Sequence, residues 1–115
     1  MKIAISSNNG AFNQPFSTRF GRCNYFVIIE SETQTWEAIS NPAAAAHGGA
    51  GTRVVQFLSD NEVQAVISGR YGPNAFSALK AAGLQVFQAR KGTPEELLDA
   101  YLAGKLKPVH KVTKP

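Results

Sequence analysis

From residue 63 onward, the chain alternates short apolar segments with segments of helical period. Residues 63–67 are typical of a strand, Pro73 opens a segment that carries Phe76 and Leu79 at helical spacing, and residues 84–87 form the last apolar run before another helix. Parallel strands cannot be joined by a tight turn and need a crossover, usually a helix. The alternation therefore predicts parallel strands with helices packed against the sheet.

The first half of the chain predicts an antiparallel meander. Residues 3–5 alternate into a polar break, residues 25–29 form an aromatic and β-branched run, and a polar turn leads into residues 35–39. The second strand then runs against the first, and the third runs with it. We expect a single α/β domain with a five-stranded mixed sheet, in which only the second strand is antiparallel, and with helices packed on its faces.

The last helix has the clearest boundaries in the sequence. Thr93 stands three residues before Glu96, which is the spacing of a capping box, and Pro94 occupies the first helical position. Gly104 lies just past the last apolar residues of this segment. These signals predict a helix that begins at Pro94 and ends before Gly104.

The positive charge of the chain is concentrated at its end. Twelve Lys and Arg against eight Asp and Glu give a formal net charge of +4, and four of the lysines lie within residues 105–115, which hold no acidic residue. We expect residues 1–104 to form a neutral domain and residues 105–115 to form a mobile basic tail. Because the excess charge lies in this tail, a nucleic-acid partner is not favoured.

Cysteine usage and the apolar pattern favour a cytoplasmic protein. A lone Cys23 rules out an internal disulfide, no apolar run approaches the length of a membrane span, and the N-terminus leads directly into a strand pattern. We expect no membrane partner, and a monomer or a weak dimer.

Four loops meet at one edge of the expected sheet. Ligands of open α/β sheets bind at the carboxyl ends of strands, where residues 7–22, 41–51, 69–73 and 89–93 gather. These loops contain no Asp or Glu and five basic residues: Arg19, Arg22, Arg70, Arg90 and Lys91. The pattern predicts a positive, acid-free cleft that attracts an anion.

A Gly-rich segment stands where the first helix begins, formed by His47, Gly48, Gly49, Ala50 and Gly51. The unpaired N–H groups and the positive end of that helix would face an anion, and glycines allow close approach. The segment lacks the endings of a P-loop and of a dinucleotide site. Gly69 and Gly72 supply a second loop of this kind, although either loop could equally be a steric turn.

His47 and Cys23 are the two candidate metal ligands. His47 could bind a metal or sulfide, donate to an anion, or cap the helix. Cys23 stands beside Arg22 at the start of an apolar strand, where a buried structural thiol is an equal alternative. One cysteine cannot hold an iron–sulfur cluster or a structural zinc ion, so packing and hydrogen bonds, or a second chain, must hold any cluster.

The sequence contains no recognisable catalytic set. The cleft lacks the carboxylates of two-metal chemistry, and its hydroxyls have only His47 as a nearby base, with no carboxylate to orient it. We therefore expect a binding protein rather than an enzyme. A phosphate- or nucleotide-binding module at the same edge, and an interaction module that acts through the basic tail, are the alternatives.

Five segments, in their order and spacing, resemble the dinitrogenase iron-molybdenum cofactor biosynthesis family. They are Arg19-Phe20-Gly21, Asn41-Pro42 followed by His47 to Gly51, Ile67-Ser68-Gly69, Gly72-Pro73-Asn74-Ala75, and Ala82-Gly83 before a short strand. The resemblance covers about residues 1–103 and implies a ribonuclease-H-like motif. It also implies a role in carrying or inserting molybdenum–iron–sulfur clusters and their precursors.

The short, stand-alone form is similar to members that hold a molybdenum–copper sulfide cluster without covalent bonds. Such a cluster is an anion that arginine and backbone N–H groups would hold, and that a recipient or assembly protein would accept. The expected contacts are Arg19, His47, Gly48, Gly49, Gly51, Gly69, Arg70 and Gly72, with Arg22, Arg90 and Lys91 at the periphery. Four aromatic residues either cover the sulfides or belong to the core: Phe12, Phe16, Phe20 and Tyr71.

Overall fold

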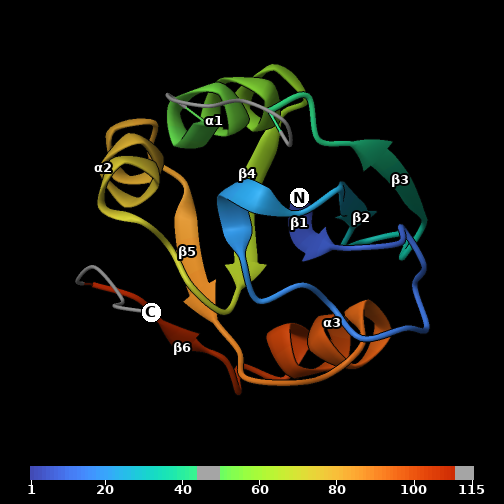
Figure 1. The fold of residues 1–115 in the computed structure, drawn as a ribbon. Helices are drawn as coiled ribbons and strands as arrows, with labels where there is room; N and C mark the ends of the chain where they lie inside the picture. Colours follow the sequence, from blue (N-terminus) through green and yellow to red (C-terminus); the bar gives the residue numbers. More distant parts are fainter. Residues whose placement is uncertain (44–49, 111–115) are drawn as a thin grey trace.

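A mixed sheet runs through the centre of the molecule, with helices on both faces (Figure 1). The computed structural model describes residues 1–43 and 50–110. The strands in this part are β1 (Lys2–Ser7), β2 (Tyr25–Glu30), β3 (Trp36–Ser40), β4 (Val63–Ser68), β5 (Gln85–Gln88) and β6 (Lys107–Pro108). The helices are η1 (Phe20–Arg22), α1 (Ala50–Asp60), α2 (Pro73–Ala81) and α3 (Pro94–Leu102).

The strand order confirms the expected topology. The sheet is ordered β3-β2-β1-β4-β5-β6, with β2 antiparallel to both β1 and β3, and with β4 and β5 parallel to β1. Strands β1, β3, β4 and β5 therefore end on the same side of the sheet. We call this side the carboxyl edge.

The sheet has six strands rather than the expected five. Strand β6 pairs antiparallel with β5, and it lies within the segment that was expected to be a mobile tail. Two apolar side chains explain this correction: Leu106 packs against the core on one face, and Val109 is buried in the core on the other. The backbone N–H of Val109 also donates to the Val86 carbonyl at 2.8 Å. Because these apolar residues stand singly among lysines, the sequence pattern does not predict a strand here.

The alternation of side chains along the strands divides the core into two clusters. Ala4, Phe26 and Val66 face α1 and α2, whereas their strand neighbours Ile5 and Val27 face α3. Figure 1 shows α1 and α2 together on one face and α3 on the opposite one. The central strands are buried on both faces, which explains their continuous apolar runs.

The helix boundaries follow the local signals. The Thr93 hydroxyl accepts from the Glu96 N–H at 3.2 Å and the Glu96 carboxylate accepts from the Thr93 N–H at 2.9 Å, so the expected capping box is confirmed. Helix α2 begins at Pro73 as expected. Among the described residues, no helix is both long and apolar enough to cross a membrane.

Candidate anion-binding site at the carboxyl edge

A long loop, residues 8–24, crosses the carboxyl edge and is anchored on both faces of the sheet. Phe16 is buried in the cluster beneath α3, and Phe20 is buried in the cluster beneath α1 and α2. The Phe16 N–H donates to the Gly92 carbonyl at 3.0 Å, and the Ser17 N–H donates to the Ser6 carbonyl at 2.8 Å. The loop is therefore a fixed part of the edge.

A buried pair of hydroxyls holds this loop to the two central parallel strands. Ser6 is the next-to-last residue of β1 and Ser68 is the last residue of β4, and their Oγ atoms lie 2.7 Å apart. The Ser6 hydroxyl donates to the Ser17 carbonyl, and the Ser68 hydroxyl lies 3.5 Å from the same oxygen. All three residues are buried. These hydroxyls serve the structure of the loop and are not exposed nucleophiles.

Gly69 allows the loop to touch the backbone that follows β4. A Cβ atom at Gly69 would lie 2.7 Å from the Cβ of Thr18 and 3.0 Å from its carbonyl oxygen. The Arg70 N–H donates to the Thr18 carbonyl at 2.7 Å, and the Phe20 N–H donates to the Arg70 carbonyl at 3.2 Å. These two bonds form a parallel bridge in which Arg19 is paired with Arg70.

The bridge places two positive side chains next to each other. Paired residues project to the same side, and Arg19 points away from its buried neighbour Phe20 because successive side chains alternate. Arg19 and Arg70 are both exposed, and no carboxylate in residues 1–43 and 50–110 forms an ion pair with either guanidinium. Like charges that face each other across paired strands are destabilising. A bound anion would relieve this repulsion.

The first turns of α1 and α2 are in contact near the same edge. A Cβ atom at Gly51 would lie 2.9 Å from the backbone N and Cα of Ala75, so the absence of a side chain permits this contact. Two helix N-termini thus add their partial positive charges to one region. Gly72, the N-cap of α2, has open space where a Cβ would be. The contact with Ala75 explains why position 51 is a glycine, whereas no packing contact explains the glycine at position 72.

The other predicted contacts, His47, Gly48 and Gly49, lie outside the described residues, and their roles stay predictions. Cys23 was expected to be either a metal ligand or a buried structural thiol, and its buried position favours the structural thiol. Its Sγ donates to the Phe20 carbonyl at 3.2 Å, and burial raises its pKa to about 12. Within the described ranges, no three His, Cys, Asp or Glu residues lie close enough together to hold a metal ion.

Most of the candidate aromatic residues belong to the core. Phe16, Phe20 and Tyr71 are buried, with the Phe20 and Tyr71 rings 5.2 Å apart. The Tyr71 hydroxyl donates to the Phe87 carbonyl at 2.6 Å, and burial raises the pKa of this phenol. Phe12 instead stacks on Trp36 at 5.1 Å between ring centroids. These positions do not favour an aromatic cover over the two arginines.

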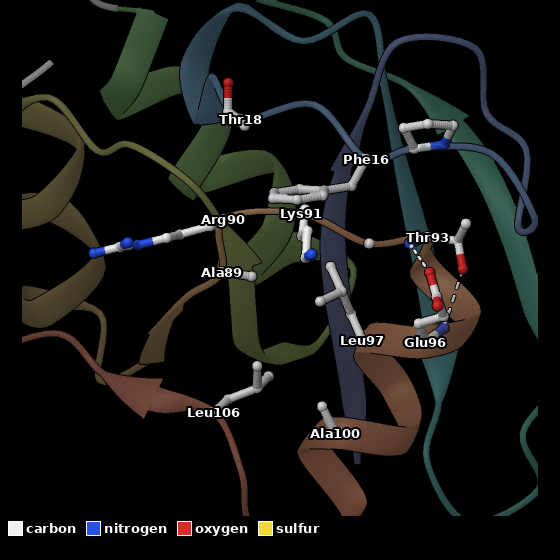
Figure 2. A pocket seen from close by; sticks show the side chains of 12 residues that line it. Phe16, Thr18, Ala89, Arg90, Lys91, Thr93, Glu96, Leu97, Ala100 and Leu106 are labelled. Carbon is white, nitrogen blue, oxygen red and sulfur yellow. Dashed lines mark hydrogen bonds between the residues drawn. The ribbon is translucent and has the colours of Figure 1, made fainter.

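Arg90 and Lys91 lie at a different part of the edge from the arginine pair. They line a cavity of about 730 Å³ on the α3 side of the loop, which Figure 2 shows from close by. The sequence placed both residues at the periphery of one acid-free cleft, but this cavity is also lined by Glu96 from α3. Reasoning from the sequence missed it because its other walls come from distant segments, including Pro15 and Leu106.

The fold and this edge define a class of protein, a small α/β domain with a cationic carboxyl edge. Among the described residues, no carboxylate forms an ion pair with the two arginines of this edge. The chain belongs to the dinitrogenase iron-molybdenum cofactor family, whose model matches residues 1–104. It is also 34% identical over 109 residues to an uncharacterized protein of Methanocaldococcus jannaschii, with 92% of this chain and 89% of the relative covered.

Two solved structures of high similarity support the same assignment. The apo form of the orange protein from Desulfovibrio gigas superposes with a TM-score of 0.93 at 29% identity, covering 98% of this chain and 96% of that one. An NMR structure of a Thermotoga protein described as a member of the DUF35 family gives a TM-score of 0.85 at 36% identity, covering 98% of this chain and 97% of that one. The family and the fold expected from the sequence are thereby confirmed.

Proposed function

We propose that this protein is a non-catalytic carrier of an anionic molybdenum-containing sulfide cluster, either a molybdenum–copper cluster or an iron-molybdenum cofactor precursor. The cluster is cargo, held without covalent bonds at the carboxyl edge and passed to a recipient or assembly protein. The observation that carries the proposal is the Arg19–Arg70 bridge, which pairs the backbones of two arginines whose side chains have no ion-pair partner among the described residues.

The donors at this edge fit such a cargo. Guanidinium groups remain charged at any physiological pH and offer several N–H donors, and a thiomolybdate-type cluster is an anion with many sulfide acceptors. The adjoining N-termini of α1 and α2 favour the same sign of ligand. The raised pKa of Cys23 keeps its thiol protonated, so we assign no metal–thiolate bond to it.

Similarity to known proteins supports the choice of metal. The description of the matching family names the iron-molybdenum cofactor, and the orange protein has nearly the same fold over nearly the whole chain. The resemblance read from the sequence implies the molybdenum–copper alternative. The two cargoes share molybdenum and sulfide, and metal analysis of the loaded protein separates them.

Reconstitution tests the proposal directly. The apo-protein is mixed with tetrathiomolybdate and a copper salt, separated from small molecules by gel filtration, and analysed for absorbance and for molybdenum and copper. We expect a visible chromophore that elutes with the protein at a fixed ratio of molybdenum to protein. Colour that elutes only in the small-molecule fraction would overturn the proposal for this cargo.

Matched variants then locate the site. Arg19→Gln and Arg70→Gln should each lower the amount of bound cluster, because each removes one of the paired charges. Lys2→Gln makes the same change of charge at the opposite end of β1 and should bind as the parent protein does. Equal loading of all three variants would place the cargo elsewhere. Calorimetry with inorganic phosphate and ATP tests the alternative ligands of this edge.

A further inference from the structure

The cavity on the α3 side of the loop is separate from the arginine pair. Its walls come from loop residues 15–18, from the segment that joins β5 to α3, from α3 itself and from the residue that precedes β6. The lining includes Phe16, Lys91, Glu96, Leu97, Ala100 and Leu106. At about 730 Å³, the cavity lies within the range of small-molecule sites, roughly 300–1,000 Å³.

The body of the cavity is apolar. Figure 2 shows the Phe16 ring on one side of the space, with Leu97, Ala100 and Leu106 on the others. Phe16 and Leu97 are themselves packed into the core, so these walls are fixed in place. A rigid aromatic ring and branched aliphatic side chains favour the flat or branched apolar body of a ligand.

The charged groups at the rim favour an anion. Lys91 and Arg90 contribute two positive charges against the single carboxylate of Glu96. That carboxylate already accepts the Thr93 N–H at 2.9 Å in the capping box, and in Figure 2 it is directed toward Thr93. Lys91 and Leu97 both line the cavity, whereas in Figure 2 the Arg90 side chain extends away from Leu97 and Leu106. Lys91 is therefore the group placed to meet a ligand.

We propose that this cavity binds a small amphipathic carboxylate, in which the carboxylate meets Lys91 and an aromatic or branched body packs between Phe16 and Leu97. This second site uses a different set of side chains from the arginine pair, and it does not depend on the identity of the cargo. The two sites adjoin each other, since Thr18 lines the cavity and precedes Arg19 in the chain.

The probe for this site is 2-naphthoate, with 2-naphthalenemethanol as a neutral analogue of nearly the same shape. Binding is followed by calorimetry and by amide chemical shifts of the full-length apo-protein. We expect naphthoate to bind with a Kd below about 1 mM, and the neutral analogue to bind at least tenfold more weakly, which is about 1.4 kcal/mol. The shifted amides should cluster in residues 89–100 and around Phe16.

Variants at exposed or half-buried positions test the site without changing a buried core residue. Lys91→Gln should weaken naphthoate binding about tenfold. Lys105→Gln, also exposed but not part of the lining, should leave it unchanged. Ala100→Phe, which fills the space beside Leu106, should abolish binding while the amide spectrum stays dispersed.

Three results would overturn this inference. They are equal affinity for naphthoate and its neutral analogue, an unchanged affinity in Lys91→Gln, and displacement of naphthoate by tetrathiomolybdate with shifts centred on Arg19 and Arg70. Loss of cluster binding in the reconstitution experiment would leave this result intact, since no metal takes part in it. Failure at the cavity and failure of the carrier proposal are thus distinguishable.

Discussion

Arg19 and Arg70, far apart in the sequence, are paired residues of one parallel bridge, and no described carboxylate forms an ion pair with either. Two backbone hydrogen bonds through Thr18, Phe20 and Arg70 fix this arrangement, so the backbones of the two arginines stay adjacent while the bridge is intact. The folded protein therefore roots two positively charged side chains at neighbouring backbone positions.

The first prediction concerns the repulsion between the two arginines. In low salt, Arg19→Gln or Arg70→Gln should raise the free energy of unfolding by about 0.2–1 kcal/mol, because a like-charge pair is removed. Urea denaturation measures this change. The gain should disappear at about 1 M salt, where charges are screened within about 3 Å. Lys2→Gln should show no such gain, and a gain of equal size there would assign the effect to overall charge.

The second prediction concerns the contact between Gly69 and Thr18. Gly69→Ala should destabilise the protein by about 1–3 kcal/mol, because the added methyl group would meet the Thr18 Cβ at 2.7 Å. Thermal or urea unfolding measures the loss. Gly21→Ala is the matched control, since a Cβ there has no neighbour within 4 Å. Equal stability of the two variants would contradict the close approach of the loop and the β4 end.

The third prediction concerns the buried hydroxyl pair. Ser6→Ala should lower the free energy of unfolding by about 1–3 kcal/mol, because the Ser17 carbonyl loses a donor in a buried setting. Faster amide exchange at Phe16 and Ser17 should accompany this loss. Because the hydroxyls act together, Ser6→Ala/Ser68→Ala should cost less than the sum of the single changes. Strict additivity would show that the two hydroxyls act independently.

The fourth prediction concerns alkaline pH. Burial raises the pKa of the Cys23 thiol from 9.0 to about 12, so between these values the unfolded chain releases a proton that the folded protein retains. The unfolded state then binds fewer protons, and the thiol contribution to stability falls as the pH rises from about 9 toward 12. Urea denaturation at several pH values measures the decline.

Cys23→Ala provides the control for this decline. Tyr71, whose pKa burial also raises, contributes to the loss of stability at high pH, so the variant should show a smaller slope rather than none. The native thiol should also resist iodoacetamide at pH 8 and react once the protein is unfolded. Rapid alkylation of the folded protein would contradict the buried position of Cys23.

Local signals account for the parts of the fold that were predicted from the sequence. The capping box at Thr93 and Glu96 depends on four consecutive residues, and the parallel direction of β4 and β5 follows from the helices that precede them. Arg19 and Arg70 were expected at one edge because both follow strands that end there. Their pairing as direct neighbours depends on Gly69 lying against Thr18, which a sequence pattern does not reveal.

Long-range packing accounts for what the sequence analysis missed. Leu106 and Val109 are isolated apolar residues among lysines. Their segment forms a strand because it pairs with the side of β5 that faces away from β4. The cavity likewise requires Phe16 and Leu106 to meet α3 from distant parts of the chain. Phe20 and Tyr71 could have served either as ligand contacts or as core residues, and the register of the Arg19 bridge decides for the core.

Strand β6 also determines how the sheet ends. An edge strand presents unpaired N–H and C=O groups with which a strand of another molecule can pair. Proteins protect such edges with very short strands, lysine and proline. Strand β6 consists of Lys107 and Pro108, and Pro108 has no backbone N–H that could pair with another strand. Lys107 and Pro108 therefore disfavour edge-to-edge pairing between molecules at this side of the sheet.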